Sequence, residues 1–164
     1  MEFFQIVLIL STFLCSLVAG FLFAFAVVVM PGIKNLGDRE FILTFQVIDR
    51  IIQNNQPIFL LVWVGSVVVL IATLALGFAK LEGPSLFILI FATLIYLFGV
   101  QLPTVIFNIP LNNKLQTLDI DRINKAKLRF AREEFESQWN RWNLIRTFIS
   151  SLVSGMLITL FIII

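Results

Sequence analysis

The segment Trp139–Arg146 holds the side chains best suited to chemistry, because it combines indoles, amides and a cation. Residues three or four positions apart share one face of a helix. On this face lie Trp139, Trp142, Asn143 and Arg146. A cation beside neutral hydrogen-bond donors stabilises an anion, or an oxyanion that forms during a reaction. We therefore predict that Arg146 and Asn143 act in catalysis and that Trp139 and Trp142 bind a ligand.

Other polar side chains are expected at the same end of the molecule. The further predicted ligand-binding residues are Gln46, Asn108, Asn112 and Asn113. Asp49 is the predicted catalytic base, and Glu133 or Glu134 is the next candidate.

A second, structural interpretation is that these residues cap helices and anchor the protein at the membrane surface, without binding a ligand. Asparagine suits turns, tryptophan suits the lipid headgroup layer, and arginine reaches out to lipid phosphates. A recessed Arg146 favours a polar pocket instead, because a charge at the centre of a membrane span costs about 2.5–3.5 kcal/mol and needs partners.

The composition predicts an integral membrane protein. Of 164 residues, 59% are hydrophobic and 13% are charged. Residues 3–30 carry no charge, and such a stretch is long enough to cross a bilayer. The formal net charge is only +2, so we expect no nucleic-acid partner and take membrane lipid as the surroundings.

The chain contains no histidine and one cysteine, Cys15. Histidine-ligated haem, a serine–histidine–aspartate triad and the common histidine-based iron, copper and zinc sites are therefore excluded. One cysteine forms neither an intramolecular disulfide nor a Cys-x-x-Cys redox pair. We expect no cofactor and no metal.

Four apolar stretches are predicted to cross the membrane as helices. They cover residues 3–30, 57–79, 84–109 and 147–164. Pro31-Gly32 is expected to end the first helix, and the glycine, glutamine and proline within residues 99–103 are expected to kink the third. Residues 80–84 read as a tight turn, so spans two and three pair as a hairpin.

Two segments between the spans have mixed composition. Residues 38–54 and 120–146 place apolar side chains on one face and charges on the other, which is typical of amphipathic helices. Asp119 or Asp121 is expected to cap the second of them. The predicted fold is all-α: a single membrane domain, residues 1–164, that forms a four-transmembrane-helix bundle. Amphipathic cytoplasmic helices are expected between spans one and two and between spans three and four.

Basic residues predict the orientation of the bundle. Residues 31–56 and 111–146 carry eleven of the twelve lysines and arginines, and the opposite side carries only Lys80. Cytoplasmic loops are enriched in lysine and arginine. We therefore expect both mixed segments in the cytoplasm and both termini on the non-cytoplasmic side of a plasma or inner membrane.

Five sequence elements resemble the anthrone oxygenase-like integral membrane family. In family order they are Val-Val-Met-Pro31-Gly, Phe45-Gln46-Val-Ile-Asp49, Asn55-Gln-Pro57-Ile-Phe59, Phe107-Asn108-Ile-Pro110-Leu-Asn112-Asn113-Lys-Leu115 and Trp142-Asn143-Leu-Ile-Arg146-Thr147. The last two are the most specific, and together the five span nearly the whole chain. Leu144 stands where many relatives carry histidine, and Asp49 stands where asparagine is frequent.

That resemblance implies four transmembrane helices. For the few members with an assigned activity, it implies oxidation of a polyketide anthrone to an anthraquinone by dioxygen, without a cofactor. An anthrone-like phenol would bind among aromatic side chains, and its anion would be stabilised by Arg146 and the amides.

A second interpretation is a non-enzymatic membrane subunit that binds lipid, quinone or pigment, or docks on a larger membrane complex. A planar aromatic or quinone-like ligand fits either interpretation. Small side chains four positions apart, as at Ser16, Gly20 and Ala24, let another helix approach closely and favour a homo-oligomer or a larger complex. A transporter has little support, because the predicted spans hold no recessed carboxylate.

Overall fold

The computed structural model describes residues 2–164, and these residues form helices and short turns without a strand. Four helices are long and apolar enough to cross a membrane. They are Phe3–Ile33, Pro57–Gly77, Gly83–Gln116 and Lys125–Ile163. The prediction of an all-α integral membrane protein with four candidate spans is confirmed.

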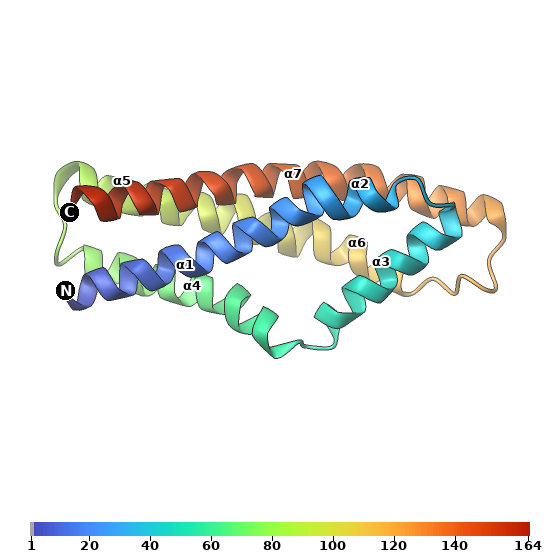
Figure 1. Ribbon diagram of the computed structural model, residues 1–164, viewed down its shortest axis with the longest axis horizontal. Helices are drawn as coiled ribbons and strands as arrows, with labels where there is room; N and C mark the ends of the chain where they lie inside the picture. Colours follow the sequence, from blue (N-terminus) through green and yellow to red (C-terminus); the bar gives the residue numbers. More distant parts are fainter. Residues whose placement is uncertain (1) are drawn as a thin grey trace.

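The long helices pack into an elongated bundle (Figure 1). α1 (Phe3–Ala24) lies against α4 (Pro57–Gly77) and α7 (Lys125–Ile163), and α5 (Gly83–Tyr96) packs on α7. Both termini lie at the same end of the bundle. There the Lys80 ammonium is 3.3 Å from the Glu2 carboxylate, so the α4–α5 turn lies beside the start of α1.

The core toward this end is apolar. Its fully buried side chains include Leu8, Cys15, Leu70, Leu89, Val153, Leu157 and Leu160. Tyr96 is buried among them, and its hydroxyl lies 2.7 Å from the hydroxyl of Ser66. The hydroxyl of Thr93 donates to the carbonyl of Leu89 at 2.8 Å. Such internal pairing is needed in lipid, because no water is present there to bind polar groups.

The first long helix continues through Pro31. α1 leads through a π-helical turn, η1 (Phe25–Val29), into α2 (Met30–Ile33), so the predicted end at Pro31-Gly32 is wrong. A proline inside a helix lacks a donor and clashes with the carbonyl four residues before it. The π-helical turn holds one extra residue, which shifts the hydrogen-bond ladder just before the proline and lets the helix pass.

The third long helix contains two such turns. After α5 come η2 (Leu97–Gln101), η3 (Thr104–Asn108) and α6 (Ile109–Gln116). Pro103 and Pro110 each follow a π-helical turn by two residues, as Pro31 does in the first helix. The two π-helical turns thus lie where the sequence predicts a kink in the third span and the end of that span near residue 109. The helix continues beyond this point, so Asn112 and Asn113 lie inside α6.

α3 (Asp38–Gln53) lies between the first two spans and packs on α6 and α7. Its buried side chains are Phe41, Ile42, Phe45, Gln46 and Asp49. Asn55, with a φ of 58°, lies in the turn into α4. Figure 1 shows α3 and α4 as two arms of a V at the edge of the bundle. Where α3 lies relative to the membrane surface stays a prediction.

α7 is one uninterrupted helix of 39 residues. Asn124 caps its start by accepting from the N–H of Lys127 at 2.9 Å, so the predicted caps Asp119 and Asp121 are wrong. Asparagine and aspartate are about equally good N-cap residues, and several of them precede the helix. Residue type alone therefore does not identify which of them is the cap. One rigid helix thus carries the whole Trp139–Arg146 segment.

Candidate functional site

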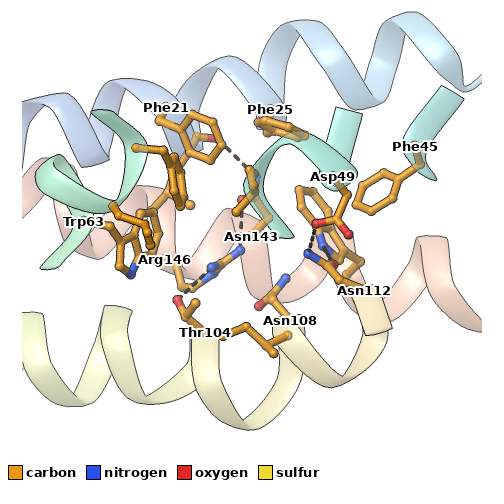
Figure 2. Close-up of a pocket in the computed structure, with 16 residues that line it drawn as sticks. Phe21, Phe25, Phe45, Asp49, Trp63, Thr104, Asn108, Asn112, Asn143 and Arg146 are labelled. Atoms are coloured by element: carbon orange, nitrogen blue, oxygen red, sulfur yellow. Dashed lines mark hydrogen bonds between the residues drawn. The ribbon is translucent and has the colours of Figure 1, made fainter. Parts of the chain in front are cut away.

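A cavity of about 220 Å³ lies where the four long helices meet α3 (Figure 2). Each of these five elements contributes to its wall. The polar lining residues are Asp49, Thr104, Asn108, Asn112, Asn143 and Arg146. The aromatic ones are Phe21, Phe25, Phe45, Phe59, Trp63 and Trp139.

The aromatic rings form a connected chain along the wall. In order from α4 to α3 they are Trp63, Phe59, Phe21, Phe25, Trp139 and Phe45. Their successive centroids lie 5.4, 5.2, 4.9, 5.6 and 5.5 Å apart. These separations fall within the range of favourable aromatic contacts. The wall therefore offers ring faces and edges to a flat, apolar ligand.

Arg146 supplies the positive charge of the cavity. It is 3% exposed, and its Nη1 donates to the Thr104 hydroxyl at 2.8 Å while its Nη2 donates to Asn143 Oδ1 at 3.2 Å. Its Nε–H has no hydrogen-bond partner in the part of the chain that the structure describes. Within residues 2–164 no carboxylate lies within 4.0 Å of the guanidinium. A buried charge held by neutral groups alone is costly, and an anionic ligand would relieve that cost.

Asn143 holds Arg146 in place. Its Nδ2 donates to the carbonyl of Leu22 on α1 at 3.1 Å, and its Oδ1 accepts from Arg146. Both polar atoms of the side chain are therefore used. Asn143 ties α7 to α1 and fixes the direction of the guanidinium.

Asn108 lies four residues after Thr104 on η3 and is 3% exposed. Neither its Nδ2 nor its Oδ1 has a hydrogen-bond partner among the described residues. Figure 2 shows its amide between Arg146 and Asn112. Buried polar atoms in folded proteins are nearly always hydrogen-bonded. The two free atoms therefore mark a place where the cavity can bind a polar group of a ligand.

Asp49 organises the opposite side of the cavity. Its carboxylate accepts from Asn112 Nδ2 at 2.8 Å, from Gln53 Nε2 at 2.7 Å and from Gln116 Nε2 at 3.0 Å. Asn112 Oδ1 in turn accepts from Trp139 Nε1 at 2.8 Å. The carboxylate, in a residue that is 2% exposed, is thus held by three amides from α3 and α6.

Six of the nine predicted site residues line the cavity: Asp49, Asn108, Asn112, Trp139, Asn143 and Arg146. The other three lie outside its wall. Gln46 donates to two carbonyls at the end of α6, at 2.8 and 3.1 Å. Asn113 Oδ1 accepts from Gln53 at 3.2 Å, and Trp142 stacks on Phe107 with centroids 3.8 Å apart. These contacts join helices to one another.

The two further candidates for a base also lie away from the cavity. Glu133 pairs with Arg129 at 2.9 Å, and Glu134 pairs with Lys114 at 2.6 Å. Asp49 is therefore the carboxylate that the described residues contribute to the wall.

The sequence did not single out Thr104 or most of the aromatic wall. A signal for Thr104 was available, because it precedes Asn108 by four residues and so shares its helix face. Phe59 belongs to one of the five family elements, but no comparable signal marks the rings of Phe21 and Phe25, since the chain has 18 phenylalanines and many lie in spans.

Leu144, at the position where the resemblance implies a frequent histidine, is 63% exposed and does not line this cavity. α7 turns it away from the cavity that Asn143 and Arg146 line. A histidine at position 144 would point outward from the cavity, so leucine at this position leaves the wall unchanged.

These features define a class of protein: an all-helical membrane protein whose four candidate spans surround an aromatic-walled cavity with a buried cation. A family model described as anthrone oxygenase matches residues 56–156, which is more than half of the chain. The chain belongs to the anthrone oxygenase family, as its sequence motifs predict. The matched region contains Asn108, Asn143 and Arg146, whereas Asp49 lies before it. No curated protein and no solved structure was found to match the chain.

Proposed function

We propose that the protein binds a planar, hydrophobic aromatic molecule with an ionisable oxygen and oxidises it with dioxygen. The proposed substrate is an anthrone and the product is the corresponding anthraquinone. One observation carries the proposal: Arg146 is a buried cation without a carboxylate partner among the described residues, in a cavity walled by aromatic rings.

The reaction needs little from the protein beyond binding, proton removal and charge stabilisation. A base removes a proton from the methylene carbon opposite the ketone, which gives a delocalised enolate. The enolate reduces dioxygen, and recombination forms a carbon–oxygen bond to a hydroperoxide. Loss of water then leaves the second carbonyl. In total the substrate loses two hydrogen atoms and gains one oxygen atom, and the other oxygen atom leaves as water.

Arg146 is suited to stabilise the enolate. Negative charge develops on the ketone oxygen as the proton leaves, and donors already in place lower the energy of that charge without reorganising. Thr104 and Asn143 hold two guanidinium nitrogens in fixed positions. The buried Nε–H has no partner among the described residues, and we assign the substrate oxygen to it.

Asp49 is the proposed base. Its Oδ1 accepts one hydrogen bond, from Asn112, and its Oδ2 accepts two, from Gln53 and Gln116. Each carboxylate oxygen has two lone pairs. Oδ1 therefore keeps one lone pair for a proton. Figure 2 shows Asp49 and Arg146 on opposite sides of the cavity, so a bound ring system would lie between them.

The test is anthraquinone formation by the purified protein in detergent, measured by absorbance against the spontaneous rate. Arg146→Gln should lower the protein-dependent rate by about 100-fold, because preorganised donors of this kind contribute about 10²–10³ in rate. The matched control is Arg141→Gln, which removes an exposed arginine on the same helix and should leave the rate unchanged. A protein-dependent rate that Arg146→Gln does not alter would contradict the proposal.

A second candidate function is binding without oxidation, in a membrane subunit that carries a lipid, quinone or pigment. It is favoured by the hydrogen bonding of Asp49, because the carboxylate already accepts from three amide donors and joins α3 to α6, which is a structural role. A protein that binds an anthrone through Arg146 but forms no anthraquinone above the spontaneous rate would support this second function.

We also propose that the cavity lies toward the cytoplasmic side of a plasma or inner membrane, with both termini on the other side. The distribution of lysine and arginine supports this orientation. A cysteine placed at the carboxyl terminus should then react with a membrane-impermeant thiol reagent added outside cells. Labelling only after the membrane is opened would contradict the orientation.

A further inference from the structure

We propose that Asn108 selects ligands that carry a hydrogen-bond donor, so that the cavity prefers phenols and enols to quinones and ethers. This inference rests on the proposed function, because it concerns the ligand of the same cavity.

Asn108 differs from the other polar residues of the wall in its hydrogen bonds. Thr104 accepts from Arg146 and donates to the carbonyl of Val100. Asn143 and Asn112 each use both side-chain polar atoms. Asn108 uses neither among the described residues, although it is 3% exposed.

The two free atoms of Asn108 make different demands on a ligand. Nδ2 donates, so it needs an acceptor, and Oδ1 accepts, so it needs a donor. Both atoms are buried and have no partner among the described residues. A ligand group that supplies a partner for each atom therefore gains more affinity than one that pairs only one of them, because an unpaired buried polar atom is costly. Swapping the amide nitrogen and oxygen leaves this requirement unchanged, because both positions are free.

Oxygen-containing aromatics differ in their ability to satisfy Asn108. A ketone, quinone or ether oxygen can accept from Nδ2 but leaves Oδ1 buried without a donor. A hydroxyl group can donate to Oδ1, and a neighbouring oxygen can accept from Nδ2. The enol tautomer of an anthrone carries such a hydroxyl at the position that becomes a carbonyl in the quinone. Asn108 would thus favour the electron-rich tautomer over the oxidised product.

Arg146 strengthens this arrangement. Its free Nε–H offers a second donor in the same cavity, near the Asn108 amide in Figure 2. Arg146 recognises negative charge, which an enolate and a polarised carbonyl both offer. Asn108 recognises a hydroxyl, which separates an enol from a quinone. The two side chains therefore supply different parts of the selectivity.

The test uses two air-stable probes, 2-naphthol and 2-methoxynaphthalene, which differ in one hydrogen-bond donor. Binding to the purified protein in detergent is measured by titration calorimetry, with empty micelles as the blank. The wild-type protein should bind 2-naphthol about tenfold more tightly than 2-methoxynaphthalene, because the methyl ether leaves the buried Oδ1 of Asn108 without a donor. Greater hydrophobicity would favour the methyl ether, so partitioning alone predicts the opposite order.

Three variants test the role of Asn108. Asn108→Leu keeps the side-chain size but removes both polar atoms, so the two probes should bind within about twofold of each other. Asn108→Asp keeps an acceptor, so the preference for 2-naphthol should remain. Asn140→Leu replaces an asparagine on α7 that does not line the cavity and should behave as wild type.

Equal binding of the two probes to the wild-type protein would overturn the inference and leave the proposed aromatic cavity standing. A preference that survives in Asn108→Leu would overturn it as well. If neither probe binds the wild-type protein, the proposed ligand class itself fails. The last result is distinguishable from the first two, because they require measurable binding.

Discussion

The two sides of the cavity differ in how completely their polar groups are paired. On the side of Asp49, the carboxylate accepts three hydrogen bonds, and Asn112 uses both its donor and its acceptor. On the side of Arg146, the guanidinium has no carboxylate partner among the described residues, and Asn108 is unpaired at both polar atoms. Asn108 and Asn112 lie only four residues apart on consecutive helical elements.

The paired polar groups stabilise the folded protein, whereas the unpaired ones are available to bind a ligand. A fully paired buried network stabilises the folded state, and removing one member leaves its partners unsatisfied. An unpaired buried group lowers stability, and folded proteins tolerate it mainly where function requires it. Substitution of a fully paired residue should therefore lower stability, and substitution of the unpaired Asn108 should not.

The largest effect is expected at Asp49. Asp49→Leu removes the acceptor of Asn112, Gln53 and Gln116, so it should lower the free energy of unfolding by about 3 kcal/mol, roughly 1 kcal/mol for each donor left unpaired. Unfolding in mixed detergent measures this loss. Asp49→Asn keeps an acceptor for Asn112 and should cost less than half as much. Equal losses in both variants would show that the hydrogen bonds of the carboxylate are not what stabilises this side.

A smaller loss is expected at Asn143. Asn143→Leu removes the side-chain donor to the carbonyl of Leu22 and leaves one nitrogen of Arg146 without a partner, so the free energy of unfolding should fall by about 2 kcal/mol. The same unfolding measurement applies. Exposed Asn54, in the turn after α3, provides the control, since Asn54→Leu should change stability by less than about 0.5 kcal/mol.

The smallest change, and the opposite sign, is expected at Asn108. Asn108→Leu removes two unpaired buried atoms and replaces them with apolar surface, so stability should stay the same or rise by up to about 1 kcal/mol. A loss of more than 1 kcal/mol would mean that Asn108 has a structural role. The contrast between the two sides of the cavity would then disappear.

Much of this arrangement is predictable from the sequence. The absence of charge across residues 3–30 and the hydropathy of the other stretches predict the four candidate spans. Helical spacing predicts that Trp139, Trp142, Asn143 and Arg146 share a face. Three of them line the cavity, whereas Trp142 stacks on Phe107 outside its wall. These predictions succeed because they depend on short-range periodicity and on the cost of placing charge in lipid.

Pairings between helices are harder to predict. Asn112 and Asp49 are 63 residues apart, and nothing in the local pattern of either segment specifies that they meet. The same limit applies to Gln46, which has the composition of a site residue but binds carbonyls at the end of α6. The hydrogen-bond partners of Gln46 depend on how α3 packs against α6, and local periodicity does not specify that packing.

The π-helical turns have a consequence for the tolerance of this protein to deletions. Each turn contains one residue more than a regular α-helical turn, so it behaves as a single-residue insertion that accommodates the neighbouring proline. Deleting one residue within Thr104–Asn108 would remove this insertion and leave η2 as the π-helical turn of that helix. All later residues of that helix would then rotate by about 100° relative to those before it. Asn112 would turn away from Asp49, although the span would remain apolar and long enough to cross the membrane. The angular register of this helix, more than its hydrophobicity, is therefore what the site depends on.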